Sequence, residues 1–258
     1  MKKIFKAIIA AACAGTLCAG VAALTGCDNS KTGEAWGLVH GAGYVGYASI
    51  TVNGDDVIDA YLNEVCFPTQ VTIDETKVSV PDGDKVSVEK SGKTTVYYKT
   101  VSYGEVTMTY DATDGYKVGS ETLAQYFKNA ENAKAYYEAV MNNSVSVTVS
   151  GAKKTDVMTK NALCKEVNGY WTRQDENGKN YSRWLLNRDA TISYVKEHGV
   201  ANLLSLVRDA EKGADGFQYW RDGDINTGAT WSDLNSKPAD GAYYSYAQLL
   251  VNAYNATK

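Results

Sequence analysis

Short β-prone runs separated by turn residues fill much of the chain up to about residue 110, and they constrain the fold most strongly. Residues 47–52 alternate in polarity, Asn53-Gly54 interrupts them, and residues 57–62 resume the pattern, as expected for a β-hairpin. Further strand-like runs occupy residues 77–80, 85–89, 94–101 and 105–110. Successive hairpins of this kind predict a mainly antiparallel sheet.

Later segments space their apolar residues as helices do. Residues 120–141 carry an apolar stripe that includes Leu123, Phe127 and Tyr137. We expect a strand at 145–149, partial helix over 153–169, a helix over 189–210 weakened at Gly199, and a last helix over 241–254. Strand runs followed by helices predict an α+β fold, with mainly antiparallel sheets and packed helices.

The N-terminus reads as a targeting segment. Residues 1–6 are basic, residues 7–25 carry no charge, and Leu24-Thr25-Gly26-Cys27 follows. The last four residues resemble a bacterial lipobox, in which the cysteine thiol receives a diacylglycerol. The resemblance implies a lipoprotein signal peptide at 1–26 and a protein anchored in the bilayer through Cys27, on the extracytoplasmic face of the cell membrane.

The same segment admits two other interpretations, a retained transmembrane helix and a plain secretory signal. The run is short for a membrane span and rich in Gly and Ala. Under the lipoprotein interpretation, residues 27–36 form a flexible tether. Residues 37–258 then form one α+β domain, with a sub-boundary near residues 142–152.

Charge and composition exclude several classes of protein. The chain has 26 basic and 30 acidic residues, and removing the three lysines of residues 1–26 leaves 23 against 30, a net charge of −7. An acidic chain without a basic stripe argues against nucleic-acid binding. Two histidines, His40 and His198, do not supply a His-rich metal site, and we expect both to be structural or exposed. The usual hydrolase and dinucleotide-binding motifs are missing.

Two cysteines remain outside the targeting segment, Cys66 and Cys164. An extracytoplasmic location permits a disulfide between them. The sequence does not show whether their Cα atoms lie close enough, so a disulfide and two buried thiols both stay open.

The most informative stretch is Asp224-Ile225-Asn226-Thr227-Gly228-Ala229-Thr230. It resembles the flavinylation motif Asp-x-x-(Ser/Thr)-Gly-Ala-(Ser/Thr) of the FMN-binding domain family, which includes surface lipoproteins of extracellular electron transfer. In that family a flavin transferase moves FMN from FAD onto the last hydroxyl residue as a phosphoester. The resemblance implies that Thr230 carries the flavin, and that Asp224, Thr227, Gly228 and Ala229 form the recognition sequence.

The family also implies partners. A tethered flavoprotein of this kind passes electrons between a membrane NADH or quinone dehydrogenase and an outer acceptor. Residues 43–47 and the hairpin through Val65 look similar to the opening strands of such domains. Residues 65–69 depart from the family's Glu-Thr-Pro-Gly segment, so no flavin contact is carried over to them. The alternative is a non-redox lipoprotein for solute binding or adhesion.

The residue types suit attachment of a phosphate. Small residues at 228 and 229 let backbone N–H groups face phosphate oxygens, and a helical turn capped by Thr230 or Ser232 would add its positive end. Asp224 would position a divalent metal during transfer. The plain alternative is a Gly-containing surface turn. Four aromatic residues lie near the motif in sequence: Trp220, Trp231, Tyr243 and Tyr244. They either stack on the flavin ring or fill the protein core.

Overall fold

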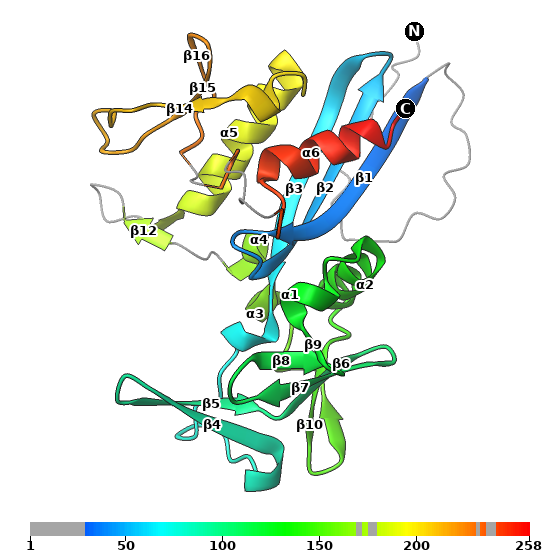
Figure 1. Ribbon diagram of the computed structural model, residues 1–258, viewed down its shortest axis with the longest axis vertical. Helices are drawn as coiled ribbons and strands as arrows, with labels where there is room; N and C mark the ends of the chain where they lie inside the picture. The colour runs from blue at the N-terminus through cyan, green and yellow to red at the C-terminus, as the bar shows by residue number, and fades with distance from the viewer. Residues whose placement is uncertain (1–28, 169–171, 175–179, 231–232, 236–240) are drawn as a thin grey trace, which may run out of the picture.

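The computed structural model describes residues 29–168, 172–174, 180–230, 233–235 and 241–258 (Figure 1). The predicted signal peptide, Cys27, Trp231 and Ser232 lie outside these residues. Within them, no helix combines the length and apolar composition needed to cross a bilayer.

A three-stranded antiparallel sheet forms the first layer, with strand order β1-β2-β3. Its strands are β1 (Ser30–Val39), β2 (Tyr44–Asn53) and β3 (Asp56–Cys66). The β2–β3 pair is the hairpin expected from the sequence. The prediction of a flexible tether over 27–36 is wrong for residues 30–36. These residues belong to β1 and pair with β2, beginning with Ser30 opposite Asn53.

Gly33 shows why this segment is strand and not linker. A Cβ at Gly33 would lie 2.2 Å from the carbonyl oxygen of Ala253 in helix α6 (Tyr246–Asn255). The missing side chain lets the helix backbone approach the strand closely. Glycine in this segment therefore serves packing, whereas the sequence pattern had suggested flexibility.

Helices α5 (Arg183–His198) and α6 cover one face of the sheet, α6 along β1 and β2 and α5 along β3 (Figure 1). A core of buried side chains fills the space between them, including Ile50, Leu62 and Leu250. Beyond α5 lies a small sheet with the order β14-β15-β16, at the outer side of the molecule (Figure 1). Its strands are β14 (Val207–Arg208), β15 (Trp220–Asp222) and β16 (Ile225–Asn226).

Residues 67–163 form an insertion between β3 and the following helix. The chain leaves β3 at Cys66 and returns beside it, where Cys164 makes an antiparallel bridge to Val65. The insertion holds the six-stranded antiparallel sheet β11-β10-β6-β7-β8-β9 and the β4–β5 hairpin. Its strands are β4 (Lys85–Lys90), β5 (Lys93–Tyr98), β6 (Thr100–Tyr103), β7 (Val106–Asp111), β8 (Gly115–Val118), β9 (Glu121–Thr122), β10 (Ser146–Val149) and β11 (Ala152–Lys154).

Helices of the insertion join the two sheets into one core. The longest, α2 (Ala130–Met141), contacts all three strands of the first sheet. Its buried Tyr136 and Val140 belong to the same core as Val65 and Val147. The remaining helices on this side are α1 (Leu123–Tyr126), α3 (Lys160–Leu163) and α4 (Lys165–Asn168), with 3-10 turns at Pro68–Gln70 and Asp82–Asp84. The expected sub-boundary near 142–152 is wrong, because β10 pairs with β6 and β11 within one sheet.

The α+β class with mainly antiparallel sheets is confirmed, and several element limits are corrected. Residues 77–80 form no strand, and residues 94–101 divide into β5 and β6 around Lys99. The helix expected over 120–141 is two helices, since Asn129 caps α2 through its side chain. The helix expected over 189–210 begins earlier, at Arg183, and ends at His198, because Gly199 caps it with φ +73°. A 3-10 turn, Leu203–Ser205, follows it.

Cys66 and Cys164 are buried free thiols, which decides between the two alternatives for this pair. The Cys66 thiol donates to the carbonyl oxygen of Leu163 at 3.3 Å, and Asn63 Nδ2 donates to Cys164 Sγ at 3.3 Å. Burial raises the pKa of Cys66 to about 12 and also raises the pKa of Cys164. Both thiols are therefore protonated and packed, as structural cysteines are.

Candidate functional site

The β15–β16 hairpin carries the first half of the Asp224–Thr230 motif. Asp222 pairs with Ile225, and Gly223 and Asp224 form the two-residue turn between the strands. Gly223 has φ +55°, which a turn of this length favours. Asp224 is exposed at the tip, where its backbone oxygen accepts from Arg221 Nη1 at 3.3 Å.

The second half of the motif folds back onto Trp220. The Thr227 N–H and hydroxyl both donate to the carbonyl oxygen of Trp220, at 3.0 and 2.9 Å. The Trp220 N–H in turn donates to the carbonyl oxygen of Ala229 at 3.0 Å. Trp220 is 7% exposed and belongs to the same buried cluster as Leu62 and Leu250, in agreement with the core interpretation. The other flanking tryptophan, Trp231, lies outside the described residues.

The backbone N–H groups of Gly228 and Ala229 have partners within the turn. Gly228 donates to Asn226 Oδ1 at 2.8 Å, and Ala229 donates to Thr227 Oγ1 at 3.2 Å. Both donors are therefore occupied within the turn by local side-chain bonds, and their contact with a phosphate stays a prediction. The first residues of a helical turn capped by Thr230 or Ser232 would include 231–232, which lie outside the described residues, so that turn stays a prediction.

Thr230 is docked against the start of α5. Its Oγ1 accepts from Arg183 Nη2 at 2.8 Å and donates to Asn187 Oδ1 at 3.0 Å. The Thr230 N–H donates to the same Asn187 oxygen at 2.5 Å. Asn187 Nδ2 donates to the carbonyl oxygen of Arg183 at 2.9 Å, which fixes the orientation of the amide. Thr230 is 8% exposed, so its hydroxyl is enclosed by partners that sequence reasoning did not identify.

One stripe of α5 contacts Asp222, Gly228 and Thr230. Arg183, Asn187, Ala190 and Tyr194 are spaced three or four residues apart, which places them on one helix face. A Cβ at Gly228 would lie 3.1 Å from Ala190 Cβ. The hydroxyl of Tyr194 donates to Asp222 Oδ2 at 2.7 Å, and this bond lowers the pKa of Asp222. Ser182 is the N-cap of α5, and its Oγ accepts from the Leu185 N–H. Serine is a typical N-cap residue, so placing the helix start here would have identified this stripe from the sequence.

The guanidinium of Arg183 is held by the loop that precedes β15. It lies 3.5 Å from the ring centroid of Phe217, as in a cation–π contact. Its Nη2 is 4.0 Å from Asp215 Oδ2. Asp215 accepts from the hydroxyl of Tyr219 at 2.5 Å. That hydrogen bond lowers the pKa of Asp215, with a smaller contribution from the charge of Arg183.

The structure brings four of the five predicted motif residues against α5 or Trp220 and leaves the fifth at the hairpin tip. None of the hydrogen bonds or ion pairs between described residues joins Asp224 to Thr230. No group of three or more His, Cys, Asp or Glu side chains suited to a metal occurs in the described part of the chain. A role of Asp224 in positioning a metal during transfer stays a prediction.

A buried charged cluster at the end of the first sheet was not predicted. Glu64 and Lys165 have no exposed side-chain surface, and Lys165 Nζ donates to Glu64 Oε1 at 2.6 Å. Tyr246 donates its hydroxyl to Glu64 Oε2 at 2.6 Å, and His40 Nδ1 lies 3.4 Å from Oε1. Burial opposes ionisation of Glu64, but the contacts with His40 and Lys165 outweigh it and lower the pKa.

Asp233 connects this cluster to the segment after Thr230. His40 Nε2 lies 3.8 Å from Asp233 Oδ2, and the Tyr246 N–H donates to the carbonyl oxygen of Asp233 at 3.3 Å. His40 is thus a structural residue, as expected, with φ +53° in the turn between β1 and β2. The Tyr244 N–H donates to the carbonyl oxygen of Leu38 at 2.7 Å, and the Tyr244 ring lies against Gly37. Both contacts favour the interpretation of Tyr244 as a residue that packs on β1.

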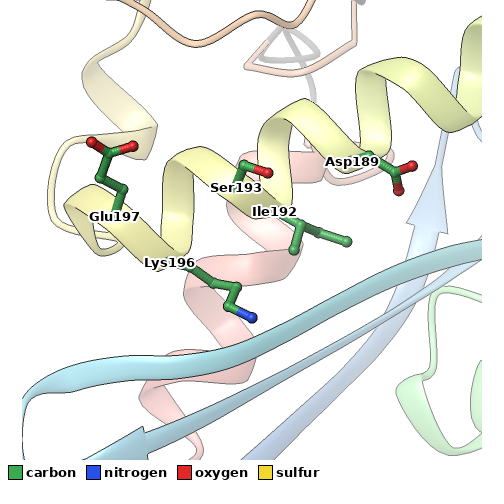
Figure 2. A pocket seen from close by; sticks show the side chains of 5 residues that line it. All are labelled: Asp189, Ile192, Ser193, Lys196 and Glu197. Atoms are coloured by element: carbon green, nitrogen blue, oxygen red, sulfur yellow. The ribbon is translucent and has the colours of Figure 1, made fainter.

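An open hollow of about 550 Å³ runs along a different face of α5 (Figure 2). Its lining side chains project from that single helix, and Lys196 reaches toward β3, where Nζ lies 3.6 Å from Asp59 Oδ1. The residues that line it are Asp189, Ile192, Ser193, Lys196 and Glu197. None of them belongs to the stripe that receives Thr230, so the hollow is separate from the candidate site.

Comparisons of the chain with family models, with curated proteins and with solved structures find no match. The candidate site therefore rests on the motif itself and on its contacts with α5.

Replacing Gly228 tests whether the motif must pack tightly on α5. Gly228 has φ +75° and faces Ala190 Cβ, whereas Gly223 has φ +55° and open space around its Cβ position. Gly223→Ala should cost about 1 kcal/mol of stability from backbone strain alone. Gly228→Ala should cost about 1 kcal/mol more, because the new methyl group crowds α5. Urea unfolding of both variants measures the difference, and equal losses would contradict tight packing.

Proposed function

We propose that this chain is a membrane-tethered extracytoplasmic electron carrier, with FMN attached through a phosphoester to Thr230. The observation that carries the proposal is the docking of the Thr230 hydroxyl against the Arg183 guanidinium, 2.8 Å away, within a matching flavinylation motif. A guanidinium is the side chain best suited to a phosphate beside that hydroxyl. The residues around Thr230 therefore fit the phosphate end of FMN.

Attachment is a phosphoryl transfer in which Thr230 is the nucleophile. Its Oγ1 attacks the FMN phosphorus of FAD, and a new Oγ1–P bond forms as the pyrophosphate P–O bond breaks. AMP leaves with the bond's electron pair, and the hydroxyl proton passes to a base of the flavin transferase. Because Arg183 and Asn187 enclose Oγ1, the hairpin must move away from α5 for the transferase to reach it.

A flavin joined through its phosphate supplies the redox chemistry, and the protein supplies the tether, the position and the surroundings. We propose anchoring through Cys27 in the bilayer, on the extracytoplasmic face. Electrons would come from a membrane NADH or quinone dehydrogenase and pass to an outer acceptor. The position of the β15–β16 hairpin at the outer side of the molecule supports this role, since a carrier must present its cofactor to partners (Figure 1).

Intact mass after co-expression with a flavin transferase tests the proposal. The wild-type chain should gain the mass of one FMN less one water, and its band should fluoresce in a denaturing gel. A second known substrate of the transferase, expressed in the same cells, serves as the positive control. An unmodified mass beside a modified control substrate would contradict the carrier function and favour a non-redox binding lipoprotein.

A further inference from the structure

We propose that Arg183 binds the phosphodiester that links FMN to Thr230. This inference rests on the proposed attachment and extends it, since Arg183 lies outside the motif. It assigns to α5 a phosphate-binding residue that is 47 positions away from the acceptor in sequence.

The position of the guanidinium follows from the bond that it already makes. Arg183 Nη2 donates to Thr230 Oγ1 at 2.8 Å, and the phosphorus would be bonded to that same oxygen. The two non-bridging oxygens are then within reach of the guanidinium without a change of helix position. An arginine offers five N–H donors in a planar fork, and a phosphate with two free oxygens accepts from it in pairs.

Among the described residues, Arg183 pairs with a carboxylate only at long range. The nearest carboxylate oxygen among the described ion pairs is Asp215 Oδ2, 4.0 Å from Nη2. That oxygen already accepts from Tyr219, and the other oxygen of Asp215 accepts from the Phe217 N–H at 3.1 Å. A phosphodiester carries one negative charge and would accept the direct hydrogen bonds that Asp215, 4.0 Å away, does not accept, from a side chain that is 19% exposed.

The surroundings hold Arg183 ready for such a ligand. Phe217 covers one face of the guanidinium at 3.5 Å, which limits the rotamers of a long side chain before any ligand arrives. Asn187 holds the acceptor from the other side. Attachment removes the hydroxyl proton and with it the bond from Oγ1, while the Thr230 N–H keeps its bond to Asn187 Oδ1. The backbone of Thr230 thus stays anchored beside Arg183.

Phosphorus NMR of the flavin-loaded protein tests the proposal. Wild type, Arg183→Gln and Arg188→Gln are loaded to completion with excess transferase and FAD, with loading followed by intact mass. Arg188 is a matched control, because it lies on the same helix but donates to Glu166 Oε1 at 2.7 Å. The reference is the FMN-bearing peptide released from each protein by proteolysis. Unfolding midpoints show whether each variant retains the fold.

We expect the phosphorus chemical shift of the phosphodiester in wild type and in Arg188→Gln to differ from that of the released peptide. In Arg183→Gln the chemical shift should equal the peptide value. An Arg183→Gln resonance equal to wild type would overturn the proposal. If Arg183→Gln stays unloaded, the loaded Arg183→Lys protein replaces it in the measurement. A shift of its resonance toward the peptide value supports the proposal, and a resonance equal to that of wild type overturns it. Absence of FMN from wild type would instead refute the proposed attachment.

Discussion

A Thr230→Ala variant co-expressed with a flavin transferase should carry no flavin at all. The substitution removes Oγ1, the only oxygen that we propose to accept the phosphoryl group. The alanine N–H still donates to Asn187 Oδ1, so the fold should lose only about 1 kcal/mol from the missing hydroxyl bonds. Intact mass and gel fluorescence measure the loss, and urea unfolding confirms that the protein is folded.

Two variants serve as controls for this result. Thr230→Ser keeps a hydroxyl and should still be loaded, because the motif accepts serine at this position. Thr257→Ala removes a hydroxyl outside the motif, which donates to the carbonyl oxygen of Tyr254, so it should leave loading unchanged. A flavin-bearing Thr230→Ala protein would show that another side chain is the acceptor.

Replacing Lys165 by methionine should destabilise the fold by about 3 kcal/mol, the lower end of the range for breaking a buried ion pair. The variant leaves Glu64 buried without its ammonium partner, although Tyr246 still donates to the carboxylate. The double variant Glu64→Gln/Lys165→Met removes the unbalanced charge and should recover most of the loss. Lys258→Met breaks an exposed pair with Asp55 and should cost less than about 1 kcal/mol.

The same pair should make wild-type stability sensitive to acid. The pKa of Glu64 is lowered in the fold, so the carboxylate contributes stability above about pH 4.5, its ordinary pKa, and this contribution is lost as the pH falls further. The double variant should lack that part of the pH dependence. Urea unfolding of both proteins from pH 7 to pH 3 measures the difference, and parallel curves would show that Glu64 is not ionised in the fold.

Local patterns predicted the elements whose structure depends on near neighbours. The β2–β3 hairpin follows from alternation and the Asn53-Gly54 signal, and α6 follows from its apolar stripe. The predictions were wrong where a distant element decides the outcome. Gly33 resembles a linker residue in sequence, and only its contact with α6 shows that it belongs to a strand. The break in the helix expected over 120–141 depends on the N-cap of α2 at Asn129.

The candidate site shows the same division. The Asp224–Thr230 motif was identified by its residues, and its hairpin turn agrees with the glycine at 223. Arg183 and Asn187 were missed because the helix was expected to start at Asp189, which left both residues outside it. The buried Glu64–Lys165 pair joins residues 101 positions apart, and no local pattern marks such a partner.

The place where the chain leaves and re-enters the first sheet has a consequence for folding. Asn63 contacts Cys164 across 101 residues, and closing a flexible loop of that length costs about 4 kcal/mol in chain entropy. A folded insertion brings its own ends together, so hairpins and α2 that form early reduce that cost. We expect refolding to build residues 67–163 first and to complete α5 against β3 afterwards. The surface that receives Thr230 is then among the last parts of the protein to form.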